Sequence, residues 1–287
     1  MTPVISILSI QSSVAYGHVG NSAATFPLMR MGVDVWPVIT VHFSNHTGYG
    51  AWRGPMLSGA DVSEVVRGID ERGVLGRCDA VLSGYQGAAD VGSAVLDTVA
   101  LVKSRNPAAI YCCDPVLGDV GRGFFVRPGI PEFMRDQVVP AAQVVTPNQF
   151  ELEYLSGRQT STVDDVLAAA DIVRGSGPDT VLVTSVVHQG AAPDTLDMIA
   201  VTGHGAWSVT TPLLHRPFQG AGDLTAAVFL ANLLLSTDVA QALARTAAVV
   251  YGVLRATIDS GEAELQLVAG QQEIAEPSTT FDVTRLR

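Results

Sequence analysis

Positive charge is scarce in this chain. The sequence holds 17 Lys and Arg against 28 Asp and Glu, so its formal net charge is −11. This balance argues against nucleic acid or an anionic membrane surface as a general partner. It leaves room for an anionic ligand, because backbone N–H groups, a metal ion or a few basic side chains can form a local positive site.

Cysteine is rarer still, and the chain contains only Cys78, Cys112 and Cys113. The last two are adjacent within an apolar run, which is typical of a buried strand, and no C-x-x-C spacing indicates zinc. We therefore expect a reducing, cytoplasmic location. No run is long and apolar enough to cross a bilayer, and MTPVISILSIQSS has no basic start, so we expect it to form a first strand rather than a signal peptide.

Two nucleotide-binding signatures are missing. No G-x-x-x-x-G-K-[ST] sequence occurs, which excludes a P-loop protein. Gly220-x-Gly222 begins like a dinucleotide fingerprint, but Thr225 stands where the third glycine belongs and no buried strand precedes it. A nicotinamide-dependent oxidoreductase is therefore a weak alternative, which an absence of NAD(P)H binding would remove.

The segments that are present alternate between strand-like and helix-like patterns, in a composition (47% hydrophobic, 16% charged) that indicates a globular protein. The expected strands are 4–10, 34–41, 79–84, 109–115, 143–148 and 179–185, and the expected helices are 21–32, 60–73 and 89–105. We also expect a hairpin over 196–211 with His204 and Gly205 at its turn, and mostly helix from Asp223 to Ile258.

This rhythm implies βαβ crossovers, so we predict an α/β fold with a mainly parallel central sheet and helices on both faces. Pro37 indicates an edge strand or a bulge, and Asn21 or Ser22 is expected near the cap of the first helix. No internal repeat or low-complexity linker interrupts the pattern. Residues 1–287 are therefore expected to form a single domain.

Polar residues recur where the expected strands end. Ser12, Tyr85, Asp114, Thr146 and Thr184 each follow or close one of these strands. Loops are generally polar, so each residue alone has an ordinary explanation. In open α/β sheets, however, ligands bind beyond the carboxyl ends of the strands, and the recurrence predicts a site at that edge.

The segment GAGD, residues 220–223, joins a glycine turn to a long apolar helix. Its N–H groups could point at one anion, helped by the helix dipole. Asp223 has two interpretations, a helix N-cap or a catalytic carboxylate, and the segment taken alone favours the cap.

Two further segments carry carboxylates. In CDPVLGDVGRGFFV, Asp114 and Asp119 are suited to bind Mg²⁺ that is held partly through water and phosphate. The glycines of this segment suggest a mobile flap, with Arg122 as a phosphate contact. An ordinary surface loop explains the segment equally well. In TPNQFELEYLSG, Glu151 and Glu153 are two apart on an expected helix, so only one of them can face the strand ends.

The segment VHFSNHTGYGAW, residues 41–52, contains His42 and His46 but no third metal ligand nearby, which argues against a metal site. A loop that offers a threonine hydroxyl and aromatic walls to a small aromatic ligand fits the segment better.

Taken in order, SIQSSVAYGHVGNSAATFP, FSNHTGYGAW, VLSGYQG, CDPVLGD, TPNQFELEYLSG, GPDTVLVTS and GAGD resemble the pyridoxal kinases over nearly the whole chain. The resemblance implies the three-layer ribokinase-like fold. It also implies transfer of the ATP γ-phosphoryl group to the 5′-hydroxyl of pyridoxal, which gives pyridoxal 5′-phosphate. By the same resemblance we expect dependence on Mg²⁺, activation by K⁺ and a homodimer.

The resemblance also implies a role for individual residues. Asp223 is expected to act as the catalytic base, beside the amides of Gly220, Ala221 and Gly222. The expected pyridoxal contacts are Ser12, Val19, Thr47, Gly48, Tyr85 and Asp223. The expected ATP contacts are Asp114, Thr146, Glu151, Thr184, Arg216, Pro217, Phe218 and Gln219, and the expected metal contacts are Asp119 and Glu151.

Ala221 departs from the resemblance, because the family usually has threonine there. The backbone N–H survives this change, so we expect an altered rate or affinity rather than loss of the reaction. Thr184 is like the animal-type branch, whereas some bacterial members have lysine. Two alternatives stay open: a hydroxymethylpyrimidine kinase on the same scaffold, and a non-catalytic protein that binds vitamin B6.

Overall fold

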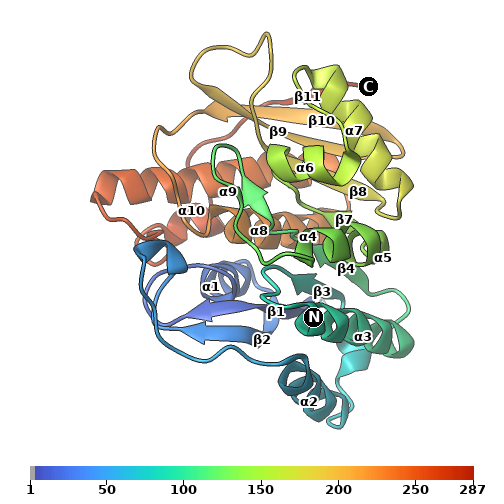
Figure 1. Cartoon of the computed structure of the whole chain (residues 1–287). Helices are drawn as coiled ribbons and strands as arrows, with labels where there is room; N and C mark the ends of the chain where they lie inside the picture. The colour runs from blue at the N-terminus through green and yellow to red at the C-terminus, as the bar shows by residue number, and fades with distance from the viewer. Residues whose placement is uncertain (1–3) are drawn as a thin grey trace.

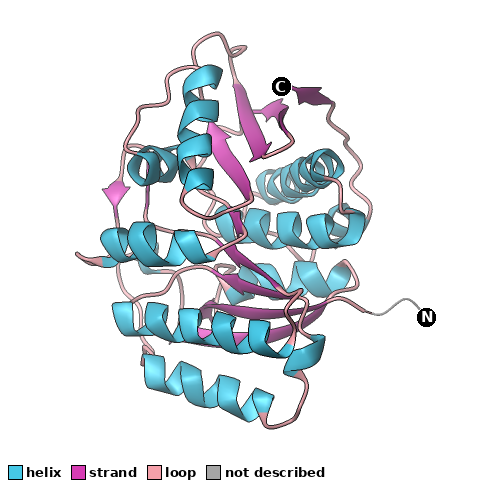
Figure 2. Cartoon of the chain, turned by 90° about the vertical axis from the view of Figure 1, so that its right-hand side faces the viewer, coloured by secondary structure: helices cyan, strands magenta, loops and turns pink. Residues whose placement is uncertain are grey.

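A central sheet of nine strands lies between two layers of helices in the computed structural model, which describes residues 4–287 (Figures 1 and 2). The strands follow the order β11-β10-β9-β8-β7-β4-β3-β1-β2. Their bounds are β1 Ser6–Val14, β2 Asp34–Phe43, β3 Ala80–Ser83, β4 Ile110–Cys113, β7 Val144–Val145, β8 Thr180–Val186, β9 Thr195–Thr202, β10 Gly205–Pro212 and β11 Val283–Arg285. The six strands from β2 to β8 pair in parallel and the last three antiparallel, which confirms the mainly parallel sheet.

The helices divide between the two faces of the sheet. Their bounds are α1 Asn21–Arg30, α2 Gly59–Asp70, α3 Ala89–Arg105, α4 Ile130–Phe133, α5 Val139–Ala141, α6 Gln149–Ser156, α7 Val163–Gly175, α8 Ala221–Ser236, α9 Val239–Ser260 and α10 Gln271–Ala275. Shorter turns are η1 Thr47–Tyr49, η2 Leu75–Arg77 and η3 Met134–Val138. One buried core lies under α2 to α7, and a second lies under α1, α8, α9 and α10. No helix of residues 4–287 is long and apolar enough to span a membrane.

The adjacent cysteines show how one strand supplies both cores. Cys112 packs in the core under α8 and α9, whereas Cys113 and Tyr111 pack in the opposite one. Successive side chains of a strand point to opposite faces, so an uninterrupted apolar run is what a strand buried on both sides requires. All three cysteines of the chain are buried and free, as the apolar context predicted for the pair.

The first crossover differs in detail from the sequence prediction. β2 is one of the two edge strands, which confirms the interpretation of Pro37, since a residue without an N–H is tolerated at an edge. Asn21 lies next to the helix cap, as predicted, but it does not cap the helix itself, because Gly20 is the N-cap of α1 and Asn21 is buried in its first turn. The Asn21 side-chain amide donates to the carbonyl oxygens of Ser9 (3.2 Å) and Val38 (3.0 Å), so it ties β1 to β2 from within the core.

Two other boundaries also differ. The expected helical stretch from Asp223 to Ile258 is divided, because Thr237 takes a positive φ of 57° and Asp238 starts α9 by accepting the N–H of Ala240. The hairpin of β9 and β10 turns at residues 203–204, so Gly205 is already the first residue of β10 rather than part of the turn.

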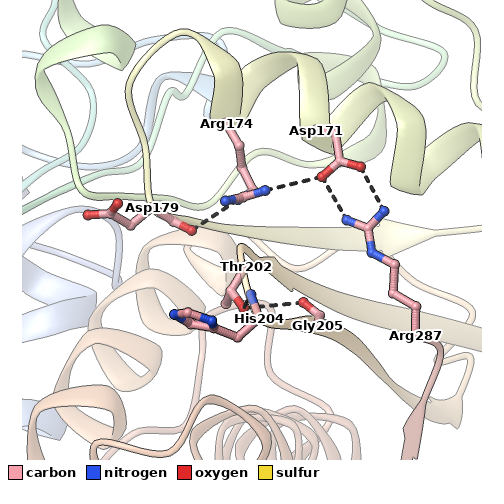
Figure 3. A network of polar contacts seen from close by, with 7 residues as sticks. All are labelled: Asp171, Arg174, Asp179, Thr202, His204, Gly205 and Arg287. Atoms are coloured by element: carbon pink, nitrogen blue, oxygen red, sulfur yellow. Dashed lines mark hydrogen bonds and ion pairs between the residues drawn. The ribbon is translucent and has the colours of Figure 1, made fainter.

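The far edge of the sheet is held by charged side chains (Figure 3). Arg287 follows β11 and donates from both terminal nitrogens to the carboxylate of Asp171 on α7, each at 2.7 Å. Arg174 contacts the same carboxylate at 3.2 Å and also donates to the carbonyl oxygen of Asp179. This network fixes β11, a strand of three residues that the sequence analysis did not predict, to a helix 116 residues earlier.

Candidate active site

A cavity of about 260 Å³ opens where the parallel strands end. Val14 closes β1, Phe43 closes β2, and Tyr85, Asp114 and Thr146 follow β3, β4 and β7. The complete lining is Ser12, Val14, Val19, Val41, Phe43, His46, Thr47, Tyr85, Asp114, Val116, Gly118, Asp119, Arg122, Phe125, Thr146, Asn148, Glu151, Thr184, Gln219, Gly220, Gly222 and Asp223. The strand-end residues singled out from the sequence therefore meet in one place, beyond the carboxyl ends of the strands, where open α/β sheets bind their ligands.

The glycine turn starts α8 at the wall of this cavity. Gly220 is the N-cap, with a φ of 80°, and a Cβ built on it would lie 1.9 Å from the carbonyl oxygen of His18. Both facts demand glycine, since a side chain there would be strained and would also clash with backbone. Gly222 and Gly220 line the cavity with their backbone, whereas Ala221 is not part of the lining.

Asp223 is the third residue of α8 and Gly220 occupies the N-cap position, so the interpretation of Asp223 as the N-cap was wrong. The residue is partly exposed and lines the cavity. Loss of hydration raises the pKa of Asp223 to about 6, although the N–H groups of Gly20 and of Asp223 itself act in the opposite direction. A carboxylate with this pKa is ionised at neutral pH and is a stronger base than an ordinary aspartate.

Two further carboxylates lie in the same cavity. Asp114 is 6% exposed and accepts a hydrogen bond from the Thr146 hydroxyl at 3.0 Å. Burial, and then the negative charges of Glu151 and Asp223, raise the pKa of Asp114 well above its usual range. Three neighbouring carboxylates with so little water create a negative potential that a cation would offset.

Glu151 serves the fold as well as the cavity. One of its oxygens accepts the N–H of Leu117 at 2.7 Å, and the other accepts the N–H of Asn148 at 2.9 Å, which closes a capping box at the start of α6. Burial raises the pKa of Glu151 to about 7 against these hydrogen bonds. Glu153 turns away and accepts the N–H of Thr160 at 2.8 Å, which confirms that only one of the two glutamates faces the strand ends.

The carboxylate oxygens at this end of the cavity are suited to a cation that the protein coordinates with only a few ligands. Asp119 is exposed and uses one oxygen to accept the N–H of Val120 at 2.8 Å, which leaves its other oxygen for a ligand. Within residues 4–287 no group of three or more His, Cys, Asp or Glu side chains could hold a metal ion by itself. Mg²⁺ fits such a site, because it keeps several waters and is usually held by one or two carboxylates together with substrate phosphates.

The opposite end of the cavity is more apolar and aromatic. Ser12, Val19, Thr47 and Tyr85, which the sequence analysis singled out, are part of the cavity lining. The lining also includes residues that the sequence analysis did not assign to the site: Val14, Val41, Phe43, His46, Val116, Gly118, Phe125 and Asn148. Val41 and Phe43 are two apart on β2 and so share a face, a periodicity that could have found them.

A hydrogen bond to the His46 ring defines which ring nitrogen carries a proton. Its Nδ1 accepts the N–H of Gly48 at 3.0 Å, so this nitrogen carries no proton, and burial lowers the pKa of His46. A neutral imidazole can then donate from Nε2 at the cavity wall. Gly48 itself is not part of the lining.

A small hairpin covers the carboxylate end. Its strands are β5 Gly118–Asp119 and β6 Gly123–Phe124, and Arg122 between them lines the cavity. Phe124 packs edge-on against Phe150 and Tyr154, with ring centroids 5.1 and 5.0 Å away. The hairpin is thus anchored at its base by aromatic rings, and its movement as a flap stays a prediction.

Three expected nucleotide contacts lie outside the lining: Arg216, Pro217 and Phe218. Arg216 donates to the carbonyl oxygen of Glu262 at 2.7 Å and lies 5.2 Å from the centroid of the Phe218 ring. Gln219, next in sequence, does line the cavity. The role of 216–218 along a nucleotide therefore stays a prediction.

This architecture, with its carboxylate-rich crevice at the strand ends and a glycine turn opening α8, defines the ribokinase-like class of α/β proteins. A sequence profile described as "Phosphomethylpyrimidine kinase" matches residues 76–267. The chain is 59% identical to the pyridoxal kinase PdxY of Rubrobacter xylanophilus over 98% of both chains. It is 52% identical to PdxY of Leifsonia xyli, over 98% of this chain and 100% of that one.

Solved structures agree with these relatives. The pyridoxal kinase from Leishmania donovani in complex with ADP and pyridoxamine superposes with a TM-score of 0.92 at 29% identity, over 98% of this chain and 99% of that chain. The pyridoxal kinase from Trypanosoma brucei gives a TM-score of 0.87 at 31% identity over 100% of both. The chain belongs to the pyridoxal kinase family.

Proposed function

We propose that this protein transfers the γ-phosphoryl group of ATP to the 5′-hydroxyl of pyridoxal and so produces pyridoxal 5′-phosphate. The observation that carries the proposal is the position of Asp223, a carboxylate of raised pKa in the same cavity as Ser12, Thr47 and Tyr85. Relatives named pyridoxal kinase and a structure that holds ADP with a B6 vitamer support the substrate pair.

The residues divide the work of the reaction. Asp223 accepts the proton of the attacking hydroxyl, and the N–H groups at the start of α8 stabilise negative charge on the transferring group. Ser12, Thr47 and Tyr85 orient the pyridine ring. Phosphoryl transfer needs such alignment and charge stabilisation more than covalent help, so these roles suffice for the protein.

The carboxylate end would receive the nucleotide and its cation. Asp114, Thr146 and Thr184 lie there, and Asp119 and Glu151 would hold Mg²⁺ through a free oxygen and through water. Bound Mg²⁺ would supply neutralisation of phosphate charge. Arg122 on the hairpin would contact phosphate and help to exclude water.

The same proposal extends to activation by K⁺, to a homodimer and to a cytoplasmic location. The first two rest on the family resemblance. The third is supported by the buried, unpaired state of Cys78, Cys112 and Cys113, which a reducing compartment preserves. Activity with KCl against NaCl and the mass in solution by light scattering test the first two, and imaging of the tagged chain in its native host tests the third.

A hydroxymethylpyrimidine kinase is the second candidate, because the matching profile carries the phosphomethylpyrimidine kinase description. One panel separates the two activities: pyridoxal, pyridoxine, pyridoxamine and hydroxymethylpyrimidine, each with ATP, Mg²⁺ and K⁺. We expect turnover of at least one B6 vitamer and much slower turnover of the pyrimidine. Absence of phosphorylation of every vitamer, with tight pyridoxal binding retained, would instead indicate a binding protein.

A further inference from the structure

Glu264 has an unusual place outside the cavity. It lies between α9 and α10, is only 7% exposed, and its two oxygens accept hydrogen bonds from segments more than 200 residues away. Oε1 accepts the Tyr49 hydroxyl at 2.7 Å, and Oε2 accepts the N–H of His18 at 3.0 Å. In Figure 1 the blue segment that contains η1 reaches the orange-red segment after α9.

The surroundings are shaped to hold this carboxylate. Gly17 has a φ of 89°, and a Cβ built on it would lie 2.2 Å from the Glu264 oxygen, so only glycine leaves room for the carboxylate. The backbone beyond Glu264 is fixed, because Leu265 and Leu267 are buried in the core under α8 and α9. Glu264 is therefore a rigid anchor that projects toward the two N-terminal loops.

Each of the two hydrogen bonds to Glu264 is one arm of the contact. The first arm, from the Tyr49 hydroxyl, supports the pyridoxal end of the cavity. η1 carries Thr47, follows His46, and contains no buried residue, so it gains little stability from packing. Tyr49 is 51% exposed, yet its hydroxyl is held by Glu264. That hydrogen bond raises the pKa of Tyr49 to about 12, so the hydroxyl keeps its proton and remains a donor at neutral pH.

The second arm, the hydrogen bond from the N–H of His18 to Glu264, supports the end of the cavity that contains Asp223. The carbonyl oxygen of His18, whose N–H binds Glu264, lies against Gly220, the residue that starts α8. Two residues further on, the N–H of Gly20 faces the carboxylate of Asp223. Residues 18–20 thus connect Glu264 to the turn that carries the proposed base.

We propose that Glu264 is a positioning residue, which joins η1 to the GAGD turn and so fixes the position of the pyridoxal contacts relative to the base. Glu264, Tyr49 and His18 together form what we call the Glu264 latch. This inference rests on the proposed kinase function, because the relative position of the two ends of the cavity matters only if the cavity aligns a hydroxyl with a phosphoryl group.

Tyr49→Phe tests the first arm by removing one hydroxyl and keeping the ring. Loss of a hydrogen bond to a charged group should raise KM for pyridoxal about five- to tenfold. The kcat and the KM for ATP should stay within about twofold, because the second arm remains. A purely structural role would lower thermal stability and leave the KM for pyridoxal unchanged.

Glu264→Ala removes both arms and should raise KM for pyridoxal and also lower kcat by about tenfold. Glu264→Gln keeps the size of the side chain and one carbonyl acceptor, so it should recover part of the loss. Glu262→Gln is the matched control, since it removes a negative charge two residues away from an exposed position and should change neither parameter.

A measurement that does not depend on turnover separates this inference from the proposed function. Arg53 is exposed and is the only Lys or Arg between Arg30 and Arg67, so trypsin reports the opening of the η1 segment by cleavage after it. Tyr49→Phe and Glu264→Ala should be cleaved several-fold faster than the wild type and Glu262→Gln.

Faster cleavage together with a raised KM supports the latch. Wild-type cleavage, or faster cleavage with an unchanged KM for pyridoxal, overturns it. If the wild type phosphorylates no B6 vitamer, the proposed function fails, and the positioning role fails with it. Faster cleavage of the variants would then show only a structural tie between η1 and the segment after α9.

Discussion

Asp223→Asn should make the protein more stable while it removes the activity. In the folded protein the pKa of Asp223 is about 6, against 3.8 for an aspartate in water. The folded state therefore binds this proton more tightly than the unfolded state, and the stability that the proton adds is lost as pH rises from about 4 through 6. Asparagine cannot ionise and escapes this loss.

The size of the effect follows from the pKa difference. About two pKa units at 1.36 kcal/mol each correspond to roughly 3 kcal/mol at pH 8, and the same linkage gives about half of that at pH 5. For a chain of this size 1 kcal/mol moves Tm by about 2 °C, so Asp223→Asn should melt roughly 6 °C higher at pH 8. Loss of the general base should lower kcat by about 10² to 10⁴.

The assay is thermal or urea unfolding at pH 5 and pH 8, in EDTA and without nucleotide, beside turnover of pyridoxal. Asp97→Asn is the matched control, because Asp97 is exposed on α3 and outside the cavity. A gain in Asp223→Asn that is equal at both pH values, or that Asp97→Asn shares, would refute the idea that Asp223 is held ionised in a poorly hydrated site.

Four further outcomes are expected. Because the base must be ionised, kcat/KM should fall about tenfold per pH unit below pH 6 and level off above it, as a pH–rate profile would show. Gly220→Ala should lose activity and melt several degrees lower, since the added methyl meets a backbone oxygen at 1.9 Å; normal kinetics would contradict this geometry. Ala221→Thr, which supplies the hydroxyl usual in the family, should raise kcat/KM for ATP about threefold or more, and an unchanged value would show that the position does not reach the nucleotide. Asp171→Asn should cost about 0.5 to 1 kcal/mol in urea unfolding by weakening its pair with Arg287, with full activity retained.

The sheet and the position of the cavity could be predicted because they depend on local patterns. Apolar runs that end in a polar residue located β3, β4, β7 and β8, and with them Tyr85, Asp114, Thr146 and Thr184. The helix over 89–105 has the predicted bounds. In each case the burial pattern of a single segment determines the element, so no distant contact had to be known.

The remaining features depend on contacts between distant segments. Asn21 resembles a cap in sequence, but its amide binds strand carbonyls in the core. Asp223 also resembles a cap, although a glycine with positive φ takes that position because the His18 carbonyl lies against it. Glu264 gave no sequence signal, since an isolated glutamate between two helices is usually exposed.

The wide sequence separation of the cavity wall has a consequence for biosynthesis. Ser12 is made early, but Asp223 and Glu264 are added when most of the chain has left the ribosome. Contacts of such long range form slowly and cannot form in a fragment. A nascent chain therefore lacks both the glycine turn and the proposed base, and we expect premature termination before residue 223 to yield a product without kinase activity.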